Sequence, residues 1–131
     1  MSFKKSQKLY EKGLVNLVGA VNSPVRAFTS VGGNPLFIKR GRGSQIIDVD
    51  GNKYVDLVLS YGPMVLGHRH KKVQKAVHKA LKNGYSFGAS TENEITLAKI
   101  VCDAFPGMDK VRFVNSGTEA VISGIRLARA Y

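Results

Sequence analysis

The C-terminal stretch, residues 110–131, constrains the fold of this chain more than any other segment. Its first part, Lys110–Asn115, is rich in Val and Phe and predicts a short strand. Ser116 then begins a helix that is apolar on most sides up to Tyr131, and we expect such a helix to be buried. A short strand followed by a buried helix is half of a β-α-β unit, which needs parallel neighbouring strands. The sequence therefore predicts the α/β class, and we expect the chain to be the N-terminal part of a larger protein.

The first 60 residues have the pattern of a helix followed by a small antiparallel sheet. A weak amphipathic helix is predicted within residues 3–17, interrupted by Gly13. Three short strands are predicted at residues 36–40, 44–49 and 53–59. Asp50-Gly51-Asn52 joins the last two, and Asp-Gly between β-branched and aromatic runs is a strong hairpin signal. Residues 19–35 between the helix and the first strand are rich in Gly, Pro and Asn, which predicts a loop.

Two further amphipathic helices are predicted before the C-terminal strand and helix. Apolar side chains recur at helical spacing within residues 71–82, and Asn83-Gly84 ends this helix. Thr91 and Glu94 have the spacing of a capping box at the start of the next helix, which ends at Pro106.

The charge of the chain is strongly positive, +11 at pH 7, but the excess is regional. Residues 1–82 hold 15 Lys or Arg and 4 Asp or Glu, whereas residues 83–131 hold five of each. The densest basic stretch, residues 68–82, places its lysines opposite the apolar face of the predicted helix and contains no aromatic residues. That pattern is typical of a solvated helix face, so we expect no nucleic-acid partner. A small basic nucleic-acid-binding module is the non-enzymatic alternative.

Composition excludes several other classes of protein. No run of 18 apolar residues is present, so we expect no membrane span. The N-terminus lacks the apolar stretch of a secretory leader, and the single Cys102 cannot form an internal disulfide, which favours a cytoplasmic protein. His68 and His70 lack a third ligand at a recognisable spacing, so we expect no metal site.

The junction between the predicted C-terminal strand and helix is the strongest candidate binding site. Backbone N–H groups at a helix N-terminus lack internal partners, and Gly117 would let an anion approach them closely. The hydroxyls of Ser116 and Thr118 can add hydrogen bonds, so the junction has the chemistry of a phosphate site. The alternative is that Ser116 and Glu119 form a capping box that needs no ligand.

Arg26 is the second candidate, because it follows a stiff Pro-containing segment, Asn22–Val25, in the loop. An arginine held in this way can bind a carboxylate through two parallel hydrogen bonds. The alternative is a solvated loop arginine in a segment without regular structure.

Six sequence blocks together resemble a known family: Gly19–Phe28, Asp48–Asp56, Ser60–Pro63, Leu66–His68, Ser86–Ala89 and Val111–Ala120. In this order they resemble the class III aminotransferases, which are pyridoxal-phosphate enzymes. The Asp-Gly-Asn hairpin, the Gly-His turn and the Ser-Gly-Thr-Glu-Ala helix start recur across this family. The Asn-Ser-Pro-Val-Arg block is more particular to its aminomutases.

The resemblance implies the type I pyridoxal-phosphate fold, assembled as a homodimer. Residues 1–60 are then the N-terminal segment with its helix and hairpin, and residues 61–131 begin the large, mostly parallel-sheet cofactor-binding domain, here truncated. The implied activity converts glutamate 1-semialdehyde to 5-aminolevulinate in tetrapyrrole biosynthesis, with the cofactor cycling through its pyridoxamine form. A sister class III aminotransferase is the alternative.

The resemblance also implies roles for individual residues. Ser116, Gly117 and Thr118 would hold the phosphate of the cofactor. The substrate would be bound by three residues: Ser23, Arg26 and Tyr61, of which Tyr61 stands where the family usually has Trp. The lysine that binds the cofactor covalently lies further along the chain in this family. We therefore expect no catalytic residue in these 131 residues, an inactive chain when isolated, and exposed apolar surface.

Overall fold

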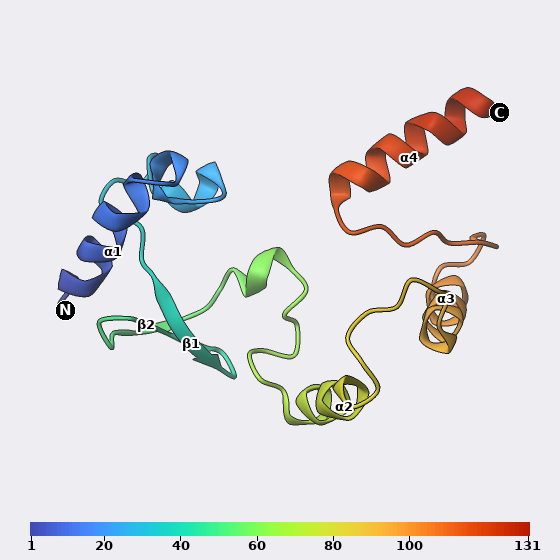
Figure 1. Cartoon of the computed structure of the whole chain (residues 1–131), viewed down its shortest axis with the longest axis horizontal. Coiled ribbons are helices and arrows are strands. Elements are labelled where there is room, and N and C mark those ends of the chain that lie inside the picture. Colours follow the sequence, from blue (N-terminus) through green and yellow to red (C-terminus); the bar gives the residue numbers. More distant parts are fainter. The chain divides into compact units, whose positions relative to one another are not determined.

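The computed structural model describes residues 1–131, which form two compact units, residues 1–83 and residues 84–131. The first unit contains α1 (Lys4–Leu14), β1 (Ile38–Arg42), β2 (Gln45–Asp48), β3 (Lys53–Val55) and α2 (Lys71–Leu81) (Figure 1). It also contains three short 3-10 turns, η1 (Val18–Ala20), η2 (Pro24–Ala27) and η3 (Leu59–Tyr61). The second unit contains α3 (Glu92–Ala104) and α4 (Gly117–Ala130). No helix of the structure has the length and apolar character needed to cross a bilayer.

The sheet of the first unit has the order β1-β2-β3 and is antiparallel throughout. The predicted hairpin at residues 50–52 is confirmed, and Gly51 adopts the positive φ of 95° that the turn requires. The third strand ends at Val55 instead of continuing to Leu59. The physical reason is that the Asp56 carboxylate accepts the backbone N–H groups of Val58 and Leu59, which turns the chain away from the sheet.

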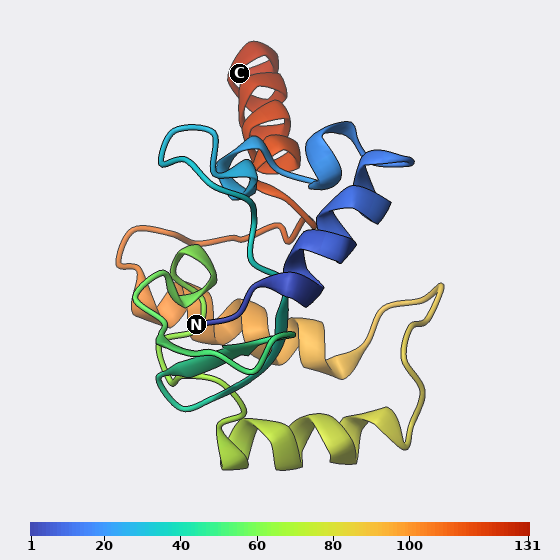
Figure 2. The same ribbon diagram turned by 90° about the vertical axis from the view of Figure 1, so that its left-hand side faces the viewer.

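The first helix is attached to the sheet by a carboxylate. Asp50, in the turn between β2 and β3, accepts hydrogen bonds from the backbone N–H groups of Lys5 and Ser6 at 2.8 and 2.9 Å. Figure 2 shows the N-terminus of α1 beside the small sheet. These N–H groups have no partner within the helix, so Asp50 satisfies them and places a negative charge at the positive end of the helix dipole.

The helix α1 passes through Gly13 without the predicted interruption. A Cβ atom at Gly13 would lie 2.9 Å from the Cβ of Ala20, so glycine is needed here for close packing. Ala20 is 3% exposed, and it and Pro35 are the only apolar residues that the structure buries. Packing of the turn η1 onto the last turn of α1 therefore compensates for the weak helix propensity of glycine.

A buried carboxylate organises the centre of the sheet. Asp48 is fully buried and accepts hydrogen bonds from the backbone N–H and the side-chain Nδ2 of Asn52, and from the hydroxyl of Tyr54. Burial alone would raise the pKa of Asp48, but these hydrogen bonds outweigh it and hold the pKa below its usual value. Burial and the neighbouring carboxylate raise the pKa of Tyr54.

The second unit begins as the sequence predicts and departs from it near its end. Thr91 and Glu94 form the predicted capping box at the start of α3. The predicted strand at residues 110–115 is wrong, because this extended segment has no neighbouring strand to pair with. The helix α4 forms, and the exposed apolar surface that we expected of the isolated chain is found on it. Its apolar side chains are half or more exposed, from 51% at Ile122 to 73% at Leu127, since the only sheet of the structure belongs to residues 38–55.

Replacing the buried carboxylate will destabilise the protein. In Asp48→Ala the Asn52 amide and the Tyr54 hydroxyl lose their acceptor, so we expect the midpoint of thermal unfolding of the purified protein to fall by several degrees. Asp103→Ala is the matched control, because Asp103 forms an exposed pair with Lys99 at 2.8 Å, and such pairs contribute about 0.3–0.5 kcal/mol. Equal shifts in both variants would contradict the role given to Asp48.

Candidate functional site

The start of α4 is built around a complete capping box. The Ser116 Oγ accepts the backbone N–H of Glu119 at 3.2 Å, and the Glu119 carboxylate accepts the backbone N–H groups of Ser116 and Asn115 at 3.0 and 2.6 Å. Ser116 has extended backbone angles, as an N-cap residue requires. The local capping interpretation of this segment is therefore confirmed.

The capping box leaves donors free at the same helix end. The backbone N–H groups of Gly117 and Thr118 and the Thr118 hydroxyl have no acceptor within the chain. A Cβ atom at Gly117 would have no heavy atom within 4 Å, so the backbone there is open to an approaching group. The cap and an anion site use different donors and are compatible. Two amides, a hydroxyl and the positive end of a 14-residue helix fit a phosphate group.

Arg26 lies in a short 3-10 turn, not in the segment without regular structure that the sequence predicted. Pro24 begins the turn η2, the Arg26 N–H donates to the Ser23 carbonyl at 2.9 Å, and Phe28 ends the turn with a φ of 60°. The backbone of Arg26 is thereby held, while its side chain is exposed and forms no ion pair. Ser23 is half-buried at the start of the same turn. The turn presents a free guanidinium group from a constrained backbone.

Tyr61 ends η3, whose backbone is left-handed. Leu59, Ser60 and Tyr61 have φ angles of 51°, 54° and 64°, although none of them is glycine. For L-residues this conformation costs about 1–2 kcal/mol per residue. The Tyr61 side chain is 64% exposed. Nothing in the residue types predicts a left-handed turn here, since Gly62 follows it and no Asn or Asp lies within it.

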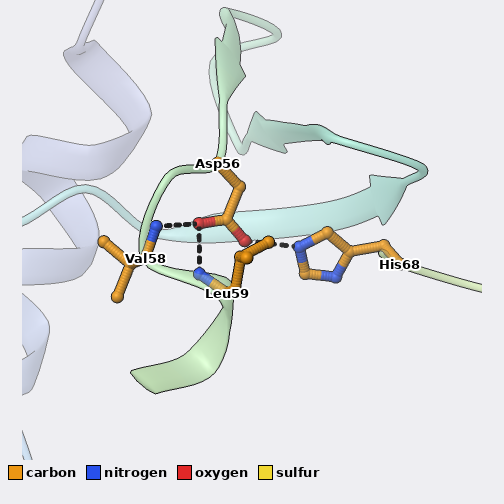
Figure 3. A network of polar contacts seen from close by, with 4 residues as sticks. All are labelled: Asp56, Val58, Leu59 and His68. Carbon is orange, nitrogen blue, oxygen red and sulfur yellow. Dashed lines mark hydrogen bonds and ion pairs between the residues drawn. The ribbon is translucent and has the colours of Figure 1, made fainter. Parts of the chain in front are cut away.

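A polar network holds the entry to this turn, and sequence reasoning did not identify it (Figure 3). One oxygen of Asp56 accepts the N–H groups of Val58 and Leu59 at 3.0 and 3.1 Å, and the other lies 2.6 Å from the Nε2 of His68. The His68 hydrogen bond, followed by the backbone hydrogen bond from Leu59, holds the pKa of Asp56 below its usual value. The two residues are separated by 12 positions, so no local pattern indicates the contact.

The candidate residues fall into three local groups. Ser23 and Arg26 share the turn η2, and Tyr61 lies in η3 of the same unit, with no hydrogen bond joining it to either of them. Ser116, Gly117 and Thr118 are contiguous in the second unit. No group of three or more metal-ligating side chains is present.

A family model described as aminotransferase class-III matches residues 28–131. Because this match covers well over half of the chain, the chain belongs to the class III aminotransferase family. Proteins named glutamate-1-semialdehyde 2,1-aminomutase from Thermodesulfovibrio yellowstonii and Syntrophomonas wolfei are 58% and 54% identical to it over 131 residues. All of this chain is covered in both comparisons, and it spans 31% and 30% of the length of these relatives.

Solved structures agree with the family match and confirm the predicted α/β fold class. An omega-transaminase from Sphaerobacter thermophilus is 37% identical, with a TM-score of 0.87 over 95% of this chain and 28% of its own. A transaminase solved with PLP bound is 32% identical, with a TM-score of 0.90 over 100% of this chain and 30% of its own. A glutamate-1-semialdehyde aminomutase from Pseudomonas aeruginosa shares the fold at 22% identity, with a TM-score of 0.65 over 76% of this chain and 22% of its own.

The low pKa of Asp56 predicts an acid-dependent stability contribution. A carboxyl group with a depressed folded-state pKa stabilises the fold above its unfolded pKa of about 3.9, and this contribution is lost as the pH falls through the lower folded pKa. We therefore expect Asp56→Asn to lower the midpoint of thermal unfolding above about pH 5, and the difference from the unmodified protein to shrink below about pH 4. A difference of constant size down to about pH 3 would contradict this assignment.

Proposed function

We propose that this chain is the N-terminal part of a pyridoxal-phosphate-dependent aminomutase that converts glutamate 1-semialdehyde to 5-aminolevulinate, the amino-transfer step of tetrapyrrole biosynthesis. The observation that carries this proposal is the identity of 54–58% over the whole chain to proteins named glutamate-1-semialdehyde 2,1-aminomutase. The free donors at the start of α4 support it, because the cofactor of such an enzyme carries a phosphate group. The basic nucleic-acid-binding alternative has no comparable support.

The cofactor phosphate is assigned to Ser116, Gly117 and Thr118. The two free amides and the Thr118 hydroxyl donate to its oxygens, while Ser116 holds the helix start through its capping bond to Glu119. The open backbone at Gly117 leaves room for the phosphate. When bound, pyridoxal phosphate supplies an electron sink for the amine-bearing carbon of the substrate.

The substrate is assigned to the first unit. Arg26 binds the carboxylate of the substrate through its free guanidinium group, and Ser23 lies at the start of the same turn. Tyr61 lines the substrate cavity with its exposed ring. Because an amino-acid semialdehyde keeps its carboxylate throughout the reaction, a fixed arginine orients it without taking part in proton transfer.

The remaining parts of the enzyme are assigned to the longer protein. The relatives are more than three times as long as this chain, and the lysine that binds the cofactor covalently is assigned to the part beyond these 131 residues. Residues 1–60 are the N-terminal segment and residues 61–131 begin the large cofactor-binding domain, whose remaining elements cover the exposed apolar faces of α2 and α4. The full-length enzyme is a cytoplasmic homodimer, and the isolated chain is inactive.

The phosphate assignment predicts a selective loss of cofactor affinity. In the full-length enzyme, Thr118→Val removes one hydrogen bond to a charged group, about 1.5–3 kcal/mol, so we expect the dissociation constant for pyridoxal phosphate to rise about 10- to 100-fold. The measurement is titration of the apoenzyme with the cofactor, followed by absorbance. Thr91→Val is the control for the substitution, because Thr91 lies at the start of a different helix, α3, and its replacement is expected to leave cofactor affinity unchanged. Unchanged affinity in Thr118→Val would contradict the assignment.

The substrate assignment predicts a KM effect without a cofactor effect. Arg26→Gln removes the cation, so we expect KM for glutamate 1-semialdehyde to rise about 10- to 100-fold while cofactor binding is unchanged. Arg42→Gln, an exposed arginine on β1, is the control. Turnover of a second amino donor, with no conversion of the semialdehyde alone, would instead identify a sister aminotransferase.

A further inference from the structure

The turn η3 is held in a conformation that its own residues do not favour. Three consecutive non-glycine residues, Leu59, Ser60 and Tyr61, all have positive φ. Such a conformation persists only where the surrounding structure determines it. Backbone hydrogen bonds within the turn run from Tyr61 N–H to the Val58 carbonyl and from Gly62 N–H to the Leu59 carbonyl, at 2.9 and 3.1 Å. They close the turn but do not fix its position relative to the sheet.

The Asp56 carboxylate fixes the entry to the turn. Its Oδ1 accepts from Val58 and Leu59, the two residues at which the chain enters the left-handed conformation. The backbone N–H of Asp56 donates to the Ser44 carbonyl at 2.8 Å, so Asp56 itself is tied to the hairpin that joins β1 and β2. A carboxylate held at both its backbone and its side chain is a rigid support for the turn.

His68 fixes the other oxygen of this carboxylate and is itself anchored. Its backbone exchanges two hydrogen bonds with Gly43, at 2.8 and 2.9 Å. Its ring lies directly over Gly41, where a Cβ atom would be 2.5 Å from the imidazole Cγ, so only glycine leaves room for the ring. The Asp56 and His68 side chains are 8% and 20% exposed, and the 2.6 Å contact between them is therefore shielded from solvent.

We propose that Asp56 and His68 are positioning residues that set the location of Tyr61 at the substrate cavity. This inference rests on the proposed function, because it takes from there the role of Tyr61. Both side chains hold protein groups only: Asp56 holds Val58, Leu59 and His68, and His68 holds Asp56. Figure 3 shows the pairing of Asp56 with His68 and the hydrogen bonds of Asp56 to Val58 and Leu59. This pairing fixes the left-handed turn relative to the β1–β2 hairpin, and thereby positions the aromatic ring of Tyr61 at the end of the turn.

The test compares His68 variants in the full-length enzyme. His68→Leu removes the polar contact to Asp56, whereas His68→Gln keeps an amide N–H at a similar reach. We expect His68→Leu to raise KM for glutamate 1-semialdehyde about tenfold, with cofactor affinity unchanged, and His68→Gln to restore a near-normal KM. His78→Leu, on an exposed position of α2 with no hydrogen bond, is the control for the substitution itself.

A double-mutant cycle with Tyr61 separates positioning from general destabilisation. If His68 acts through Tyr61, the KM of the combined variant Tyr61→Leu/His68→Leu equals that of Tyr61→Leu alone. Hydrogen exchange followed by mass spectrometry should also show faster exchange in residues 57–62 of His68→Leu. If His68→Leu does not fold, His68→Asn, whose amide is too short to reach Asp56, takes its place against His68→Gln.

The results for His68 test the positioning role, and the result for Tyr61→Leu tests the substrate assignment on which that role rests. Additive effects in the cycle, or a normal KM in His68→Leu while Tyr61→Leu raises KM, overturn the positioning role and leave the proposed function intact. Unchanged exchange in residues 57–62 overturns it as well. A normal KM in Tyr61→Leu shows that Tyr61 does not line the substrate cavity, and both the substrate assignment and the positioning role then fail.

Discussion

Hydrogen bonds from backbone N–H groups to acidic side chains are the interaction on which this structure depends. The chain has nine Asp and Glu residues, and five of them accept backbone N–H groups at a turn or a helix start: Asp48, Asp50, Asp56, Glu94 and Glu119. Apolar burial cannot take this role, because Ala20 and Pro35 are the only apolar residues that the structure buries. An unpaired N–H group is costly, and a carboxylate satisfies two at once while also favouring the positive end of a helix. The few acids of this basic chain are thus placed where the backbone changes direction.

The exposed apolar faces have a physical explanation in the type of fold. In α/β proteins a helix after a strand buries its apolar face against the sheet, so α4 and α2 carry the side chains of buried helices. In this structure Val121, Ile125, Val73 and Val77 are all about half exposed or more. The apolar pattern of these exposed faces agrees with the fact that the chain spans only 22–31% of the length of the relatives and solved structures compared.

At the start of α4, a capping box and a candidate phosphate site use different donors of one helix end. Ser116 and Glu119 accept the backbone N–H groups of Glu119, Ser116 and Asn115, so the helix start is held by side chains of the chain itself. The amides of Gly117 and Thr118 remain for an anion. A preformed site of this kind avoids the entropic cost of ordering the backbone when the ligand binds.

Features that depend on residues close in sequence were determined by the sequence alone. The two capping boxes pair Thr91 with Glu94 and Ser116 with Glu119, three residues apart, and the turn at Gly51 joins adjacent strands. Local chemistry therefore determines these features. The free donors at the start of α4 depend on the same local residues, so a phosphate site could be proposed there from the sequence. The tertiary structure alone decided the left-handed turn at Tyr61 and the contact between Asp56 and His68, since these depend on groups brought together across the β1–β2 hairpin. Residues 110–115 were predicted as a strand from their composition, but a strand exists only when a neighbour accepts its hydrogen bonds.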